Sequence, residues 1–113
     1  MLRNLTRKTL LAKHPAEAAG YWGRFLGLMG RKNFPREYDA LVFENCTSIH
    51  CFFMCMVIDA VFTDKEGRAV RCFHGLRPWR LAFGGRKSRS VIELPAGTLK
   101  QSGTEPGDQL SFD

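Results

Sequence analysis

The chain has 113 residues, of which 44% are hydrophobic and 25% are charged, and its formal net charge is +6. These values predict one globular domain over residues 1–113 and exclude a globally disordered chain, while the positive charge makes polyanions conceivable partners. The longest apolar run, residues 49–62, is shorter than the about 20 residues of a membrane helix and is interrupted by His50 and Asp59, so we expect no membrane span.

Residues 6–14 are predicted to form an opening strand, with Leu10 and Ala12 on one face. Residues 14–29 are then predicted to be helical, because Pro15 suits a first helical turn. The N-terminal leucines are interrupted by basic residues, so the segment is not of the signal-peptide type. A cytoplasmic protein with free thiols is therefore expected.

Two strands are predicted from Val, Ile and Phe content, at residues 40–46 and 49–62. A turn at residues 64–67 leads to a return strand at residues 68–74, so that a β-hairpin forms.

The turn also sets an expected register for this hairpin. If Thr63 pairs with Arg68, Cys72 falls opposite Asp59 and has no cysteine across from it. We therefore predict no disulfide within the hairpin.

Residues 77–90 are predicted to form a long basic loop and residues 91–94 a strand. A short helix opened by proline follows at residues 95–103, then a type II turn at residues 105–108 and a final strand at residues 109–113. The whole pattern predicts a mainly β (α+β) fold. The expected architecture is a small, partly closed antiparallel or mixed β-barrel of five or six short strands, with one N-terminal helix and one short C-terminal helix.

Five motifs occur in a fixed order along the chain: RFLGLMGR (24–31), CTSIHCFFMCMVIDAVFTDKEGRAV (46–70), LRPWR (76–80), ELPAGT (93–98), and GD followed by LSF (107–112). From about residue 6 to its end the chain thereby resembles the prokaryotic family known as domain of unknown function 192. The resemblance implies a compact, mainly β single domain. It carries no established activity, cofactor or partner, so it assigns no catalytic residue. The family often has Thr at the position of Cys51 and a polar or charged residue at that of Cys55, which argues against a shared role for these cysteines.

Zinc-ligating residue types occur at Cys46, His50, Cys51 and Cys55, but their spacing is not C-x-x-C. In an extended strand Cys51 and Cys55 lie about 13 Å apart. Zinc requires its thiolates about 4 Å from one another. We therefore predict no metal site and no cofactor.

Asp59 needs a partner, because a buried and unpaired carboxylate in so apolar a segment costs several kcal/mol. Arg24, on the predicted helix, can grip a carboxylate with two hydrogen bonds, and we hypothesise an Arg24–Asp59 ion pair. Alternatively, Asp59 and His50 face a ligand cavity.

The leading functional hypothesis is a non-catalytic binding or accessory module. Amide groups at a helix start bind anions, which makes the Leu94–Thr98 corner a candidate pocket wall. A small polar or anionic ligand, or a protein segment, would bind in a shallow pocket there. The candidate ligand-binding residues are Arg24, His50, Asp59, Glu93, Gly97 and Thr98.

The rival hypothesis is a small hydrolase or transferase that uses His50 with Asp59 or Glu93. No motif presents a nucleophile on a strained turn, and strand alternation places His50 and Asp59 on opposite faces. We therefore assign no catalytic residue and favour a protein that is not an enzyme.

A third hypothesis is nucleic-acid binding by the basic loop, in which cations would hold phosphates and aromatic side chains would stack on bases. The residues concerned are Arg77, Trp79, Arg80, Arg86, Lys87 and Arg89, with Phe83 between them. The interpretation that we favour at this point is that Trp79 covers one end of the barrel and the charges are solvated.

Overall fold

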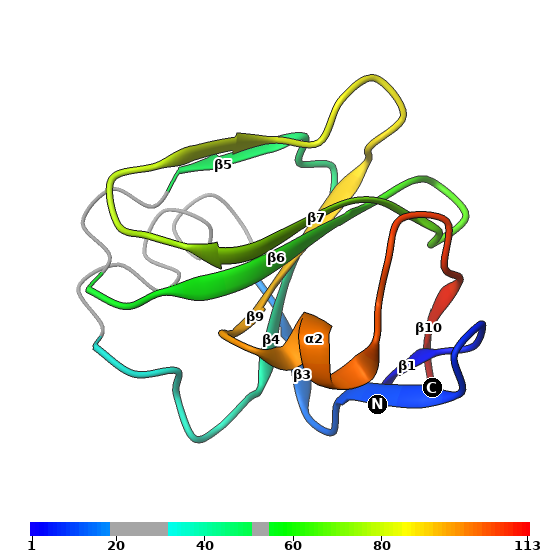
Figure 1. The fold of residues 1–113 in the computed structure, drawn as a ribbon, viewed down its shortest axis with the longest axis horizontal. Coiled ribbons are helices and arrows are strands. Elements are labelled where there is room, and N and C mark those ends of the chain that lie inside the picture. Colours follow the sequence, from blue (N-terminus) through cyan, green and yellow to red (C-terminus); the bar gives the residue numbers. More distant parts are fainter. Residues whose placement is uncertain (19–31, 51–54) are drawn as a thin grey trace.

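The computed structural model describes residues 1–18, 32–50 and 55–113, without the side chain of His50 (Figure 1). These residues form ten strands and one short helix, which confirms the mainly β fold. The strands are β1 (Leu2–Asn4), β2 (Thr9–Ala12), β3 (Pro15–Glu17), β4 (Ala40–Phe43), β5 (Ser48–His50), β6 (Ile58–Thr63), β7 (Ala69–Leu76), β8 (Leu81–Phe83), β9 (Ser90–Pro95) and β10 (Leu110–Phe112), and the helix is α2 (Thr98–Ser102). The expected number of five or six strands is therefore wrong.

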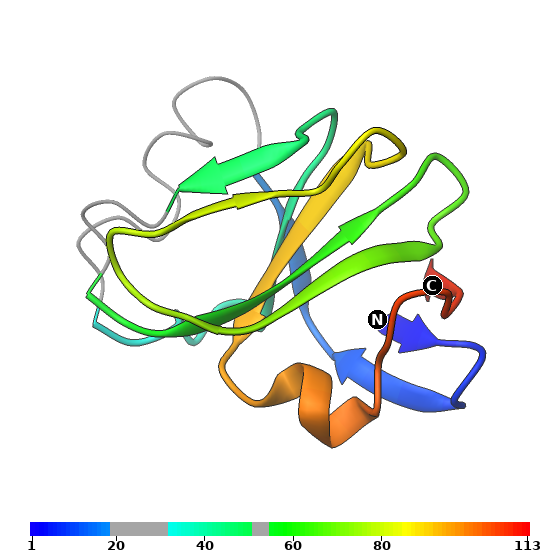
Figure 2. The same cartoon turned by 45° about the horizontal axis from the view of Figure 1, so that its top comes forward.

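A five-stranded sheet with the order β3-β4-β9-β6-β7 lies at the centre of the fold. The other strands form a three-stranded sheet, β10-β1-β2, and a two-stranded ribbon, β5-β8, which lie on different sides of it (Figure 2). Within the described parts of the chain these sheets do not join into a closed barrel, so the predicted barrel is not confirmed. No helix in these parts is long and apolar enough to cross a membrane.

Each face of the central sheet buries its own hydrophobic cluster. On one face, Val42, Val61, Ile92 and Leu94 pack with Leu99 of α2 and with residues of the three-stranded sheet. The other face buries a cluster that the ribbon covers; its buried members are Leu41, Phe43, Ile49, Ile58, Ala60, Phe62, Ala82 and Val91. Strands β4, β6 and β9 are consequently buried on both faces, and side chains of any polarity along them lie inside the protein.

The apolar run at residues 49–62 does not form the single strand that was predicted. Its ends belong to β5 and β6, which lie in different sheets, and residues 55–57 are not in a strand. Ile49 of β5 and Ile58 of β6 nevertheless share one hydrophobic cluster. The run is apolar because its two ends belong to two packed layers, the ribbon and the central sheet. It is not the alternating pattern of one strand. Cys51, and with it the distance argument about zinc, lies outside the described residues.

The start of the predicted N-terminal helix is also wrong. Residues 15–17 form β3, which runs parallel to β4 with Pro15 opposite Ala40. Because β3 is an edge strand, Pro15 can occupy its first position without losing a sheet hydrogen bond. Residues 19–29 of the predicted helix lie outside the described residues.

The predicted basic loop at residues 77–90 contains a strand. Leu81–Phe83 form β8, antiparallel to β5, and Ser90 already belongs to β9. A strand of three residues among Arg, Pro and Gly leaves almost no local pattern, and its partner is more than 30 residues away in the chain.

The predicted hairpin is confirmed as β6 and β7, but its register is wrong. Cys72 lies opposite Val61 instead of Asp59, and Thr63 pairs with Ala69, because the register shifts at two places along β6. Cys72 still has no cysteine across from it.

Two further corrections concern side-chain faces and element ends. Leu10 is exposed whereas Ala12 is buried, because the register of β1 and β2 shifts and breaks the alternation. The short helix begins at Thr98, since Pro95 still pairs with Ile58 in the sheet.

The C-terminal turn and strand are confirmed. The amide of Asp108 donates to the Glu105 carbonyl at 3.1 Å, Gly107 has φ 99°, and β10 follows.

Candidate functional site

Asp59 is buried on β6, on the face of the sheet that packs against α2, and is only 1% exposed. Its Oδ1 accepts a hydrogen bond from the amide of Gly75 at 2.9 Å. Its Oδ2 accepts hydrogen bonds from the amides of Gly97 at 3.1 Å and Leu99 at 2.9 Å. The need for a partner was predicted correctly, and the partners among the described residues are backbone amides. The proposed ion pair with Arg24 lies outside the described residues.

These contacts change the interpretation of the Leu94–Thr98 corner. From the sequence, the amides of Ala96, Gly97 and Thr98 could bind an anion, but a tight strand-to-helix corner that needs Gly97 was the favoured interpretation. In the structure an internal carboxylate binds the amides of Gly97 and Leu99, and it ties α2 and β7 to the centre of the sheet. The signal that could have revealed this is glycine at positions 75 and 97, since both adopt positive φ, at 66° and 95°.

Glu93 lies on β9, opposite Leu41 and Ala60, and is 4% exposed. Burial raises the pKa of its carboxyl group to about 8, so that the group is mostly protonated at neutral pH. Leu94, the next residue of β9, pairs with Asp59 and faces the hydrophobic cluster that packs against α2.

The two carboxyl groups therefore do not share a pocket. Neighbouring residues of a strand point to opposite faces, so Glu93 and Asp59 lie on different sides of the central sheet. The backbone of His50 lies in β5, opposite Leu81, and its side chain is outside the description. The use of His50 together with Asp59 or Glu93 therefore stays a prediction.

Strand β8 presents an outward face that is unusually apolar. Leu81 and Phe83, at its two ends, are 56% and 57% exposed, whereas Ala82 between them is buried in the core. Trp79 lies in the turn that precedes β8, with φ 65°, and is 57% exposed. Trp79 was expected to cover one end of a barrel. It keeps more than half of its surface exposed, and the described strands form no barrel for it to cover.

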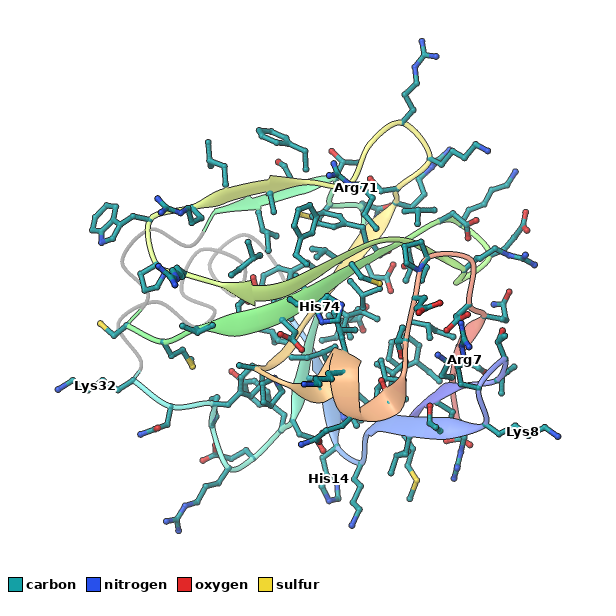
Figure 3. All side chains as sticks on the ribbon, in the orientation of Figure 1. Arg7, Lys8, His14, Lys32, Arg71 and His74 are labelled. Carbon is teal, nitrogen blue, oxygen red and sulfur yellow. The ribbon has the colours of Figure 1, made fainter. Side chains whose placement is uncertain are left out.

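Cationic side chains surround this face, and all of them are exposed: Arg71, Arg77, Arg80, Arg86, Lys87 and Arg89. Arg71, labelled beside the ribbon in Figure 3, donates from Nη1 to the Phe83 carbonyl at 2.8 Å and lies 4.8 Å from the centre of the Phe73 ring. In the described part of the chain, the ion pairs involve only Met1, Arg3 and Arg7 as cations. Among the described residues, the cations around β8 thus form no ion pair with a carboxylate.

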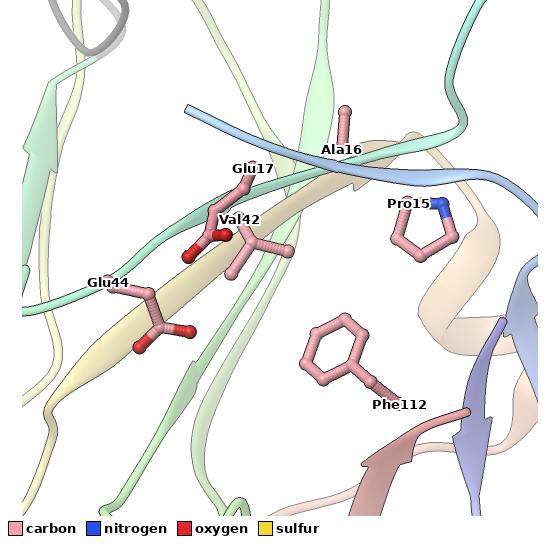
Figure 4. Close-up of a pocket in the computed structure, with 6 residues that line it drawn as sticks. All are labelled: Pro15, Ala16, Glu17, Val42, Glu44 and Phe112. Carbon is pink, nitrogen blue, oxygen red and sulfur yellow. The ribbon is translucent and has the colours of Figure 1, made fainter. Parts of the chain in front are cut away.

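A hollow of about 200 Å³ lies between β3 and β10 and was not predicted (Figure 4). Its wall contains Glu17, Glu44 and the exposed ring of Phe112, and Glu44 accepts a hydrogen bond from Ser90 Oγ at 2.7 Å. Two glutamates favour a cation there, and the anionic ligand expected from the sequence would be repelled.

Within the described ranges, no group of three or more His, Cys, Asp or Glu side chains could hold a metal ion. Cys46, Cys55 and Cys72 are free thiols. Burial raises the pKa of Cys72 to about 11, so that this thiol stays protonated and unreactive at neutral pH.

Comparison with known proteins identifies the family. The DUF192 family, described as "Uncharacterized ACR", matches residues 9–112. The chain belongs to this family. The resemblance deduced from the five motifs is thereby confirmed.

Curated DUF192 relatives bear the name UPF0127. The UPF0127 protein of Thermococcus gammatolerans is 35% identical over 119 residues, which cover 100% of this chain and 75% of the relative. The UPF0127 protein PH1112 of Pyrococcus horikoshii is 38% identical over 95 residues, which cover 79% of this chain and 78% of the relative.

Two solved structures share the fold, each with a TM-score of 0.74. One is a protein of unknown function from Novosphingobium aromaticivorans, with 17% identity over 87% of this chain and 74% of that protein. The other, from Sinorhizobium meliloti, has 23% identity over 86% of this chain and 79% of that protein. At these identities the likeness extends to the fold alone.

Proposed function

We propose that this DUF192 domain is a non-catalytic binding module that holds single-stranded nucleic acid against the outer face of β8. One observation carries the proposal: Leu81 and Phe83 on β8, and Trp79 in the turn before it, are each more than half exposed within a segment rich in exposed cations. Exposed apolar patches bounded by polar residues are characteristic of interaction sites.

The chemistry of this face suits a flexible polyanion that carries aromatic bases. Stacking of a base on an aromatic side chain contributes about 1–3 kcal/mol and tolerates any base sequence. Trp79 and Phe83 are four residues apart, so they lie no further from each other than the about 13 Å of an extended chain, a separation that two bases of one flexible strand can span. Arginine and lysine around them would neutralise phosphates, and the net charge of +6 would speed association.

The interior carboxyl groups support a module without catalysis. Both oxygens of Asp59 accept backbone hydrogen bonds, and Glu93 is mostly protonated at neutral pH. A general base must be ionised and within reach of a substrate proton. Neither carboxyl meets these conditions.

A second candidate function is the small-ligand pocket near His50 and the Leu94–Thr98 corner. The observation that favours it is the position of Glu93, a carboxyl group only 4% exposed on the face of the central sheet that the ribbon covers, where its raised pKa lets it donate a hydrogen bond to a ligand. A Glu93→Gln variant would still bind such a ligand, whereas Glu93→Leu would lose it, as thermal-shift screening of metabolites would reveal.

A cytoplasmic location, which the free thiols support, completes the proposal.

Fluorescence anisotropy of a labelled 15-nucleotide oligothymidine in moderate salt tests the leading proposal. We expect saturable binding that Trp79→Ala weakens about 10-fold, within the range for one lost stacking contact. A duplex of equal length and a polyglutamate peptide should compete weakly.

Phe112→Ala is the matched control, because Phe112 is a similarly exposed aromatic residue on β10. Absence of binding, equal loss in the Phe112 variant, or stronger competition by polyglutamate would contradict the proposal. The last result would identify an acidic protein segment as the partner instead.

A further inference from the structure

We infer that a cationic pocket at one end of the ribbon grips the phosphodiester backbone of the strand that β8 binds. This inference rests on the proposed function and assigns the phosphate contacts to particular residues. The pocket has a volume of about 350 Å³ and lies between the β6–β7 turn and the β8–β9 loop. Its lining residues are Asp64, Lys65, Glu66, Arg86, Lys87 and Arg89.

The charges of the pocket favour an anion. Its four cations outnumber its two carboxylates. One of these carboxylates is held by its own turn, because Oδ1 of Asp64 accepts the amides of Glu66 and Arg68, both at 2.9 Å. The pocket therefore presents a net positive charge to solvent, and its two arginines can each bind a phosphate with two parallel hydrogen bonds.

Backbone hydrogen bonds fix the end of the β8–β9 loop to the last residue of β6 and to the β4–β5 connection. The amide of Arg89 donates to the Thr63 carbonyl at 2.7 Å, and the Arg89 carbonyl accepts from the Cys46 amide at 2.8 Å. Inside the β8–β9 loop, Ser88 Oγ donates to the Gly85 carbonyl at 2.9 Å. The backbone positions from which the cations project are thus set before any ligand arrives, which lowers the entropy cost of binding.

Close packing holds the same loop down on the core. Ser88 is buried, and a Cβ at Gly84 would collide with the side chains of Ser88 and Phe62. Only glycine fits where the chain leaves β8, so the loop turns sharply toward the β6–β7 turn. This packing brings Arg86, Lys87 and Arg89 to the rim of the pocket.

The pocket adjoins the Phe83 end of the aromatic face along the chain. The β8–β9 loop follows Phe83 directly, and Arg71 binds the Phe83 carbonyl at the junction. A bound strand would therefore stack bases along Trp79 and Phe83 and place backbone phosphates in the pocket at the Phe83 end. Lys32, in contrast, lies at the opposite end of the molecule in Figure 3.

The salt dependence of binding separates phosphate contacts from stacking. For single strands, each phosphate contact adds about 0.7 to the slope of log K against log salt concentration. We expect the Arg86→Gln/Lys87→Gln double variant to lower this slope by about 1.4, which corresponds to two lost contacts. Trp79→Ala should weaken binding without changing the slope.

Lys32→Gln/Arg36→Gln is the matched control, since both residues are exposed, lie in another segment and remove the same net charge. An abasic oligonucleotide gives a second readout, because it retains phosphates and lacks bases. The pocket variant should bind it at least 5-fold more weakly than wild type does, and the Trp79 variant should bind it equally well. Thermal midpoints of all variants verify folding.

The outcomes distinguish the pocket assignment from the proposed function of the aromatic face. If wild type binds oligothymidine but the pocket variant keeps the wild-type slope, or if the Lys32/Arg36 control loses as much slope, the pocket assignment is wrong and the aromatic face stands. If wild type binds no single strand at all, both the pocket assignment and the proposed function are overturned.

Discussion

Strands β6 and β8 are both rich in hydrophobic residues, but they are buried to very different extents. Every residue of β6 is buried, including Asp59, because both faces of the central sheet are covered. In β8 only Ala82 is buried, while Leu81 and Phe83 face solvent. Hydrophobic content alone does not distinguish a core strand from an exposed one, whereas the number of covered faces does.

The comparison also explains which polar groups are available for function. Asp59, in the buried strand, is bonded to backbone amides of β7 and α2 and serves the structure. The cations that flank β8 lie at the surface and form no ion pair among the described residues. The buried Asp59 already has hydrogen-bond partners inside the protein, whereas the exposed cations can still bind a ligand.

The largest expected contrast compares two phenylalanines. Phe62→Ala should destabilise the domain by about 3–5 kcal/mol, because it empties a fully buried site that packs against Phe73. Phe83→Ala should change stability by less than about 0.5 kcal/mol, since more than half of its surface is already in water. Urea unfolding of both variants measures the difference. Similar losses in the two variants would contradict the assignment of β8 as an outward face.

Removal of the buried carboxylate should have the next largest effect. Asp59→Ala leaves one buried and two partly buried amides without their acceptor and should cost about 3 kcal/mol, whereas Asp59→Asn keeps one oxygen acceptor and should cost less. Oligothymidine affinity of the folded Asn variant should equal that of wild type. A loss of affinity without a loss of stability would show that Asp59 faces the ligand.

Glu93 should make stability depend on pH in a direction opposite to that of most carboxyl groups. Its folded pKa of about 8 lies above its ordinary value of 4.5, so the folded state binds more protons between these values. Stability should therefore fall as pH rises from about 5 to 8, with a slope of at most about 1.4 kcal/mol per pH unit. Thermal or urea unfolding at several pH values measures this, and Glu93→Gln should remove the slope. An unchanged slope in the variant would show that Glu93 is ionised in the folded protein.

Local patterns predicted much of the fold. Strands β4, β9 and β10, the β6–β7 hairpin and the end of α2 at Gly103 follow from residue types and turn signals within a few positions. The errors arose where tertiary packing overrides such signals. β8 exists only because β5 lies beside it, and the register shifts in β6 cannot be read from alternation.

The candidate site was predicted only in part for a similar reason. A buried Asp59 demands a partner, but the backbone amides that it accepts from leave no trace in residue identity and were not predicted. The segment from Arg77 to Arg89 was identified by its charge and aromatic content, yet whether Trp79 packs inward or faces solvent depends on the layer beneath it. That Glu93 and Asp59 lie on opposite faces became visible only once the β6–β9 register was known.

The central claim is that the aromatic face of β8 stacks on bases, and the fluorescence of Trp79 tests it most directly. In a Trp22→Phe background, Trp79 is the sole tryptophan of the chain. Titration with oligothymidine should quench its emission to a saturating value, and added salt should restore it. Emission that stays constant while anisotropy reports a bound oligonucleotide would place the ligand elsewhere and contradict the account.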